Sequence, residues 1–132
     1  MGDVMGHGFQ AAVTMSQYRS LLRTIATNVT GVEEILEEFD RQVAQLGLER
    51  LATCLLAVVD PQDGTCTAAG AGHPPPAVLR PDGSIDILWL PAGPPIGTGL
   101  GGYEPKRRVR GRRRNPCCPP APSRPVTAQL IL

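Results

Sequence analysis

The chain has 132 residues, 42% of them hydrophobic, and a formal net charge of +1 at pH 7. This length and composition are typical of one globular domain that is large enough to bury a core. No apolar run reaches the roughly 18 residues of a transmembrane helix, and the glycine-rich, acidic start excludes a basic secretory signal. We therefore expect a cytoplasmic protein without a membrane partner.

The small net charge hides an uneven distribution of charged residues. Residues 1–105 contain all 12 acidic residues, whereas residues 106–132 contain 8 of the 13 basic residues. This division predicts a folded domain over residues 1–105 and a basic, proline-rich, disordered tail over residues 106–132. The tail has no aromatic residue on which bases could stack, so we expect no nucleic-acid partner. Binding of the tail to nucleic acid or anionic lipid through its charge is the alternative.

The chain opens on the segment Gly2-Asp3-Val4-Met5-Gly6-His7-Gly8. An acidic residue, turn-forming glycines and a histidine run directly into a helical pattern, which is typical of a polar site at a strand-to-helix junction. A helix is predicted over residues 9–28, because apolar side chains recur there at spacings of three and four residues. These side chains are Ala11, Met15, Tyr18, Leu22 and Ile25.

A second amphipathic helix follows the first. Thr30 and Glu33 predict a capping box at its start, and Gly47 predicts its end. Four glutamates in its first turns suit the positive end of the helix dipole. The apolar face consists of Val32, Ile35, Leu36, Phe39, Val43 and Leu46.

Four later segments predict β-strands that pair as two hairpins. These segments are residues 52–60, 65–71, 77–80 and 85–90. Residues 61–64 form the first hairpin turn, and residues 91–102 form a loop rich in proline and glycine. Two helices followed by antiparallel strands predict the α+β fold class.

The four cysteines do not predict a disulfide framework. Cys54 and Cys66 fall in neighbouring predicted strands, but the hairpin would not place them opposite one another. Cys117 and Cys118 are adjacent, which is poor spacing for a zinc site or an unstrained disulfide. We expect reduced thiols, with those of the domain buried.

The segment from Gly6 to Ala11 also matches the dinucleotide-binding pattern G-x-G-x-x-A. That pattern requires a preceding strand within a parallel βαβ unit. Few residues precede Gly6, and a second helix rather than a strand follows the first helix. The context therefore argues against dinucleotide binding.

Six motifs follow one another along the chain in a family-specific order. They are Gly2–Gly8 with Ala11, Ala12 and Met15; Ala52-Thr53; Asp60-Pro61 with Gly64; Ala71-Gly72-His73-Pro74-Pro75-Pro76; Pro81-Asp82-Gly83; and Gly93-Pro94-Pro95-Ile96-Gly97. Together they resemble the motifs of bacterial metal-dependent (PPM-type) protein serine/threonine phosphatases, in the branch of stage II sporulation protein E (SpoIIE) and RsbU. The resemblance covers about residues 2–104.

The resemblance implies an α/β/β/α sandwich of antiparallel sheets and helix pairs, of which this chain would form a part. It also implies two Mn²⁺ or Mg²⁺ ions, which prefer oxygen ligands, and attack of a metal-bound water on phosphoserine or phosphothreonine. By resemblance, Asp3 is a metal ligand and Val4 contributes its backbone carbonyl. His7 is the candidate general acid or phosphate contact. For His73, which precedes three prolines, we expect a structural hydrogen bond in a rigid loop.

Two departures from the family pattern bear on activity. The family's Gly-Gly-Asp-x-x-Asp segment would precede the first residue of this chain, and the acid-free tail stands where the family has Tyr-Thr-Asp-Gly. Asp3 is thus the one expected metal carboxylate in the sequence. One carboxylate cannot organise a tight site for two divalent ions.

We therefore expect an impaired phosphatase for a phosphorylated regulatory protein, such as an anti-sigma-factor antagonist. The alternative is a non-catalytic regulatory or interaction remnant of the domain, whose helix pair serves as a docking surface.

Overall fold

The computed structural model describes residues 1–48, 50–60, 65–79 and 83–109. The elements along the chain are β1 (Gly2–Val4), α1 (Phe9–Asn28), α2 (Val32–Gln45), β2 (Ala52–Asp60), β3 (Thr65–Ala71), β4 (Ala77–Leu79), β5 (Ile85–Ile87) and β6 (Lys106–Val109). This order confirms the α+β class. The predicted turn at residues 61–64, residue 80 of the second hairpin and Cys117 and Cys118 lie outside the described residues.

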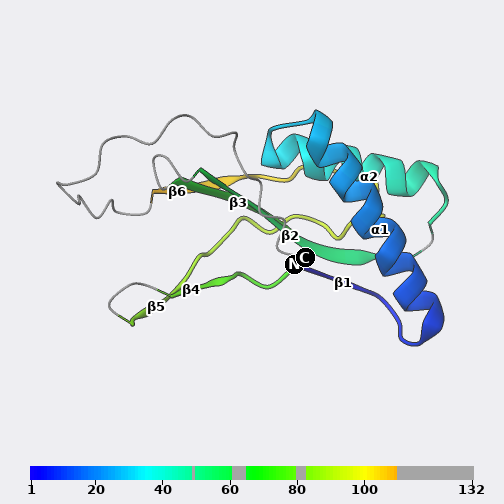
Figure 1. Ribbon diagram of the computed structural model, residues 1–132, viewed down its shortest axis with the longest axis horizontal. Helices are drawn as coiled ribbons and strands as arrows, with labels where there is room; N and C mark the ends of the chain where they lie inside the picture. Colours follow the sequence, from blue (N-terminus) through cyan, green and yellow to red (C-terminus); the bar gives the residue numbers. More distant parts are fainter. Residues whose placement is uncertain (49, 61–64, 80–82, 110–132) are drawn as a thin grey trace.

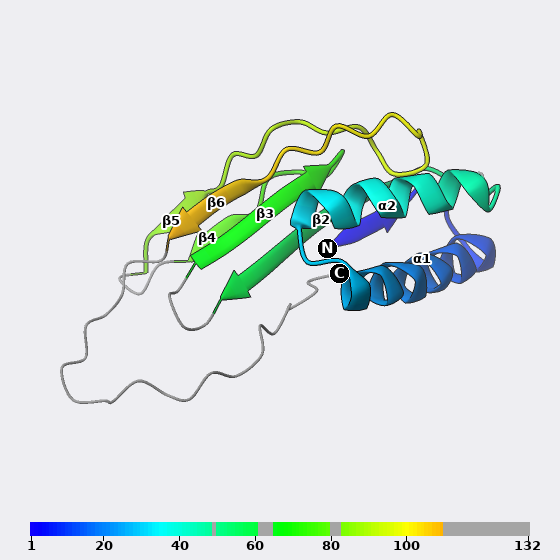
Figure 2. The same cartoon turned by 90° about the horizontal axis from the view of Figure 1, so that it is seen from above.

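Four strands form one antiparallel sheet in the order β1-β2-β3-β6, and β4 pairs with β5 in a separate antiparallel hairpin. Figures 1 and 2 show α1 and α2 together on one side of the larger sheet, with the β4–β5 hairpin away from the helices. The described residues therefore supply one helix layer and one sheet layer of the expected sandwich, together with the hairpin.

The core lies between the helix pair and the larger sheet. Its buried side chains include Tyr18, Leu22 and Ile25 from α1, Ile35, Leu36, Phe39 and Val43 from α2, and Ala52, Cys54, Leu56, Ala69 and Ala71 from the sheet. The helical periodicity thus predicted most of the apolar contacts correctly. Leu46 is an exception, because α2 ends at Gln45 and the Leu46 side chain is 62% exposed.

The start of α2 differs from the predicted capping box. Gly31 is the N-cap residue, and no side chain caps the first turn, so Thr30 lies one position too early to cap it. Glu33 and Glu34 still lie in the first turn, where the helix dipole favours negative charge. The predicted end is confirmed, because Gly47 adopts a positive φ of 61° directly after the C-cap Leu46.

The sheet continues past the predicted domain boundary at residue 105. Lys106–Val109 form β6, which pairs with β3 so that Lys106 lies opposite Ala68. The expectation of a disordered tail is therefore wrong for residues 106–109, because β3 offers them an unpaired edge that their backbone can join whatever their charge. Residues 110–132 lie outside the described part of the chain.

The two domain cysteines are not opposite one another, as predicted, but only Cys54 is buried, and the expected burial is wrong for Cys66, which is half-buried. Cys54 lies opposite Gly2, and Cys66 lies opposite Val59. Burial raises the pKa of the Cys54 thiol to about 11, so this thiol stays protonated at neutral pH. Of the helices in the described residues, none is long and apolar enough to span a membrane.

Candidate metal centre

Asp3 lies in β1, directly opposite Thr53 of β2. The next residue, Val4, is buried in the core beneath the helices. Because successive side chains of a strand point to opposite faces of its sheet, the exposed Asp3 side chain faces away from the helix pair. The predicted strand-to-helix junction is therefore present, with its acidic side chain on the open face.

The backbone carbonyl of Val4 points away from β2. The N–H group of Met5 donates to the carbonyl of Leu51 at 2.9 Å, on the β2 side of the strand. The described chain contains no cis peptide bond, so the Val4 carbonyl, which shares a peptide plane with this N–H group, points in the opposite direction. Since β1 is an edge strand of the described sheet, that carbonyl faces the open edge.

Asp3 and Val4 thus offer a carboxylate and a carbonyl oxygen, which are the ligands that hard divalent cations prefer. They fit part of an Mn²⁺ or Mg²⁺ coordination shell, and a cation held there would supply a water of lowered pKa. Among the residues that the structure describes, no group of three or more His, Cys, Asp and Glu side chains could hold a metal ion. The candidate site in the described residues therefore consists of two oxygen donors on one strand.

His7 lies in the loop that joins β1 to α1. Gly6 and Gly8 flank it with φ angles of 109° and 83°, which glycine adopts without steric cost. The two glycines let the chain reverse into α1, which begins at Phe9, and they leave the His7 side chain exposed. A role of His7 as general acid or phosphate contact stays a prediction.

Thr53 and His73 form a pair next to Asp3. His73 Nδ1 lies 2.8 Å from Thr53 Oγ1, which confirms the structural hydrogen bond expected for His73. Thr53 lies opposite Asp3, so both side chains are on the same face of the sheet. The prediction of site residues missed Thr53, because its place beside Asp3 follows from the register of β1 on β2. The only available signal was the Ala52-Thr53 motif.

The pH dependence of stability should report on His73. Burial lowers the pKa of His73 below its ordinary value of 6.5, the positive amino terminus lowers it further, and the Asp3 carboxylate acts in the opposite direction. The unfolded chain therefore binds this proton first, and stability that is present above about pH 6.5 is lost as the pH falls from that value through the lower pKa of the folded chain.

Urea unfolding at about pH 7 and about pH 5 measures this loss. His73→Gln should show a smaller loss between the two conditions than the unmodified chain. Equal losses in both proteins would contradict the assignment to His73.

Two comparisons with known proteins show the family of this chain. The sequence model of the family described as stage II sporulation protein E (SpoIIE) matches residues 1–109, a range that ends with β6. The chain is also similar to the crystal structure of the RsbU and RsbW domains of Rv1364c from Mycobacterium tuberculosis, with 34% sequence identity and a TM-score of 0.70. That similarity covers 82% of this chain and 30% of that one, so this chain spans less than a third of its solved relative.

The helix pair on an antiparallel sheet, the acidic junction and both comparisons define a PPM-type phosphatase fold of the SpoIIE and RsbU kind. The chain belongs to the SpoIIE family.

Proposed function

We propose that this chain acts as part of a metal-dependent protein serine/threonine phosphatase, with Asp3 and Val4 as ligands of Mn²⁺ or Mg²⁺. Membership of the SpoIIE family supports this class of reaction. The observation that carries the proposal is the pair of oxygen donors on β1: the exposed Asp3 carboxylate and the Val4 carbonyl directed to the open edge.

The proposed substrate is a phosphorylated regulatory protein of the cytoplasm, such as an anti-sigma-factor antagonist. The solved relative contains an RsbU domain and an RsbW domain in one protein, which supports a regulatory protein as the partner. His7 is exposed next to the proposed ligands, where its side chain could contact the phosphoryl group. We propose that activity is impaired, because a single carboxylate balances little of the charge of two divalent ions.

Replacing Asp3 with Asn should weaken Mn²⁺ binding by about tenfold or more, since even the loss of a residue that only supports a ligand costs about 10- to 100-fold in affinity. The same variant should lose the slow release of phosphate from a phosphoserine peptide. Isothermal titration calorimetry with Mn²⁺ and a phosphate-release assay measure the two effects. Glu104→Gln is the matched control, because Glu104 is an exposed acidic residue two positions before β6, which lies at the opposite edge of the sheet from β1. Equal Mn²⁺ affinity in Asp3→Asn and the unmodified chain would contradict the proposal.

A second candidate function is a non-catalytic interaction module. It is favoured by two apolar side chains at the start of α1, since Phe9 is 80% exposed and Val13 is 37% exposed. Exposed apolar side chains that lie one turn apart on a helix can contribute to docking. A titration that detects no Mn²⁺ binding in the millimolar range would favour this function over the phosphatase.

A further inference from the structure

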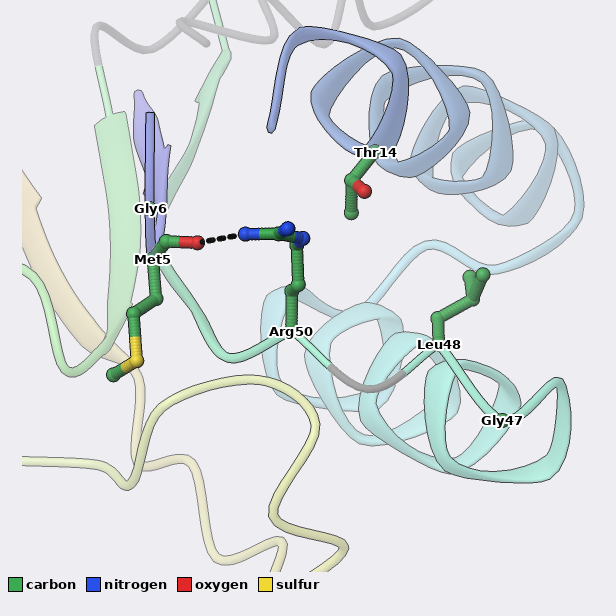
Figure 3. A pocket seen from close by; sticks show the side chains of 6 residues that line it. All are labelled: Met5, Gly6, Thr14, Gly47, Leu48 and Arg50. Atoms are coloured by element: carbon green, nitrogen blue, oxygen red, sulfur yellow. Dashed lines mark hydrogen bonds between the residues drawn. The ribbon is translucent and has the colours of Figure 1, made fainter. Parts of the chain in front are cut away.

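Arg50 connects the segment before β2 to the loop after β1. Its guanidinium Nη1 donates to the carbonyl of Met5 at 3.0 Å, across 45 positions of sequence. Figure 3 shows the side chain reaching from this segment toward Met5 and Gly6. The arginine borders a pocket of about 530 Å³ lined by Met5, Gly6, Thr14, Gly47, Leu48 and Arg50.

The backbone of Arg50 is itself anchored in the core. The hydroxyl of Tyr18 donates to the Arg50 carbonyl at 2.6 Å and lies 3.3 Å from the carbonyl of Leu48. Tyr18 is 3% exposed, and its ring packs edge-on against Phe39 with centroids 5.6 Å apart. The guanidinium therefore extends from a backbone position that a buried side chain of α1 holds in place.

Two hydrogen bonds hold Met5 on both sides of its Cα atom. Its N–H group donates to Leu51, and its carbonyl accepts from Arg50. The first bond orients the Val4 carbonyl, and the second orients the peptide that leads into Gly6. A hydrogen bond from a charged donor is stronger than one between neutral groups. The two neighbouring residues Arg50 and Leu51 thus fix the path of the chain directly after Asp3 and Val4.

Gly6, the residue after Met5, leaves space for the Arg50 guanidinium. A Cβ atom on Gly6 would collide with Arg50 Nη1, and Gly6 has a positive φ of 109°. A larger residue at position 6 would therefore have to displace the guanidinium and would also be strained. The contact between Arg50 and the loop therefore depends on glycine at position 6.

We propose that Arg50 is a positioning residue for the candidate metal centre: by holding the Met5 carbonyl, it keeps the end of β1 against β2, where the hydrogen bond from Met5 to Leu51 orients the Val4 carbonyl. This role rests on the proposed function as far as the metal is concerned. The hydrogen bond from Arg50 to the Met5 carbonyl is present in the structure whether or not the chain binds a metal ion. Loss of the guanidinium leaves a loop with two positive-φ glycines and a single remaining hydrogen bond at Met5, so the loop samples more conformations.

The test compares Arg50→Ala with the unmodified chain in two measurements. Amide hydrogen exchange by NMR at Met5, whose N–H group donates to the Leu51 carbonyl, should become about tenfold faster, because the end of β1 opens locally without global unfolding. The Kd for Mn²⁺ should rise about tenfold, as for other residues that orient metal ligands. The urea midpoint should stay unchanged, which separates positioning from a general loss of structure.

Two further variants make the result specific. Arg50→Lys keeps a cationic donor on a long side chain and should recover most of the slow exchange. Arg23→Ala removes an exposed arginine of α1 and should leave exchange at the Met5 amide unchanged. If Arg50→Ala does not fold, Arg50→Gln and Arg50→Lys provide the same contrast, because the shorter neutral amide of Gln does not reach Met5.

The two measurements also distinguish this proposal from the proposed function. Absence of Mn²⁺ binding in the unmodified chain would overturn the metal centre, while faster exchange in Arg50→Ala would still support the role of Arg50 in holding the loop. Unchanged exchange in Arg50→Ala would overturn the positioning role whether or not the chain binds Mn²⁺.

Discussion

Replacing Asp40 with Ala should lower the free energy of unfolding by about 4 kcal/mol, because it removes a buried carboxylate that binds three backbone N–H groups. Asp40 lies in α2 and is 1% exposed. Its Oδ1 atom accepts from Gly97 at 2.7 Å and from Gly99 at 3.2 Å, and Oδ2 accepts from Gly101 at 3.3 Å. All three glycines have positive φ angles, which lets the loop turn these N–H groups toward one carboxylate.

The loop that Asp40 holds also supports the strand of the candidate site. Ile96, just before Gly97, exchanges backbone hydrogen bonds with Ala52 at 2.8 Å and 3.0 Å. Ala52 in turn lies opposite Val4. The loss of Asp40 should therefore loosen the loop next to the β1–β2 pair, in addition to leaving three backbone N–H groups of the loop without their shared acceptor.

Urea unfolding followed by circular dichroism measures the effect. Glu37→Ala is the matched control, since Glu37 is an exposed acidic residue one turn earlier in α2, and it should change stability by less than about 0.5 kcal/mol. Asp40→Asn keeps the shape and one acceptor oxygen and should fall between the two. A loss of less than about 1 kcal/mol in Asp40→Ala would show that solvent readily replaces the carboxylate.

Local periodicity predicted the helices and strands of this chain well. Contacts between residues far apart in the sequence could not be predicted in this way. The apolar spacing on α1 gave the correct bounds and the correct buried face, because helix packing depends on which side chains share a face. Asp40 sits between Phe39 and Val43 on the buried side of α2, although the apolar spacing that predicted this side did not include it. Its partners lie 57 to 61 positions away, in a loop that shows no periodic pattern.

The same distinction applies to the candidate site. The junction of Asp3 with α1 was predicted from adjacent residues, since a short motif contains the acid and the turn glycines together. The approach of Thr53 to Asp3 and of Arg50 to Met5 depends on how β1 pairs with β2. Strand register is set by tertiary packing as well as by local sequence, so these neighbours became visible only in the folded chain.

Replacing Gly93 with Ala should lower the free energy of unfolding by about 3 kcal/mol, because the position has no space for a side chain. A Cβ atom there would lie 2.5 Å from the Gly70 carbonyl oxygen and 2.8 Å from Cδ1 of Tyr103. Neither neighbour can move easily. Gly70 is paired with Leu55 in the sheet, and Tyr103 is 3% exposed in the core. Gly93 cannot move away easily either, because its carbonyl accepts a hydrogen bond from Gly72 at 2.9 Å.

The matched control lies across the same contact. A Cβ atom on Gly70 would have Leu90 Cδ1 as its nearest neighbour, at 3.7 Å, which is an ordinary van der Waals distance. Gly70→Ala should therefore change stability by less than about 1 kcal/mol, since alanine also lowers the entropy of the unfolded chain. Urea unfolding of the two variants in parallel measures the difference. Similar losses of stability in both variants would mean that strand β3 itself requires glycine. An unchanged free energy of unfolding in Gly93→Ala would show that the loop from residue 91 to residue 102 can move away from the sheet without cost to the core.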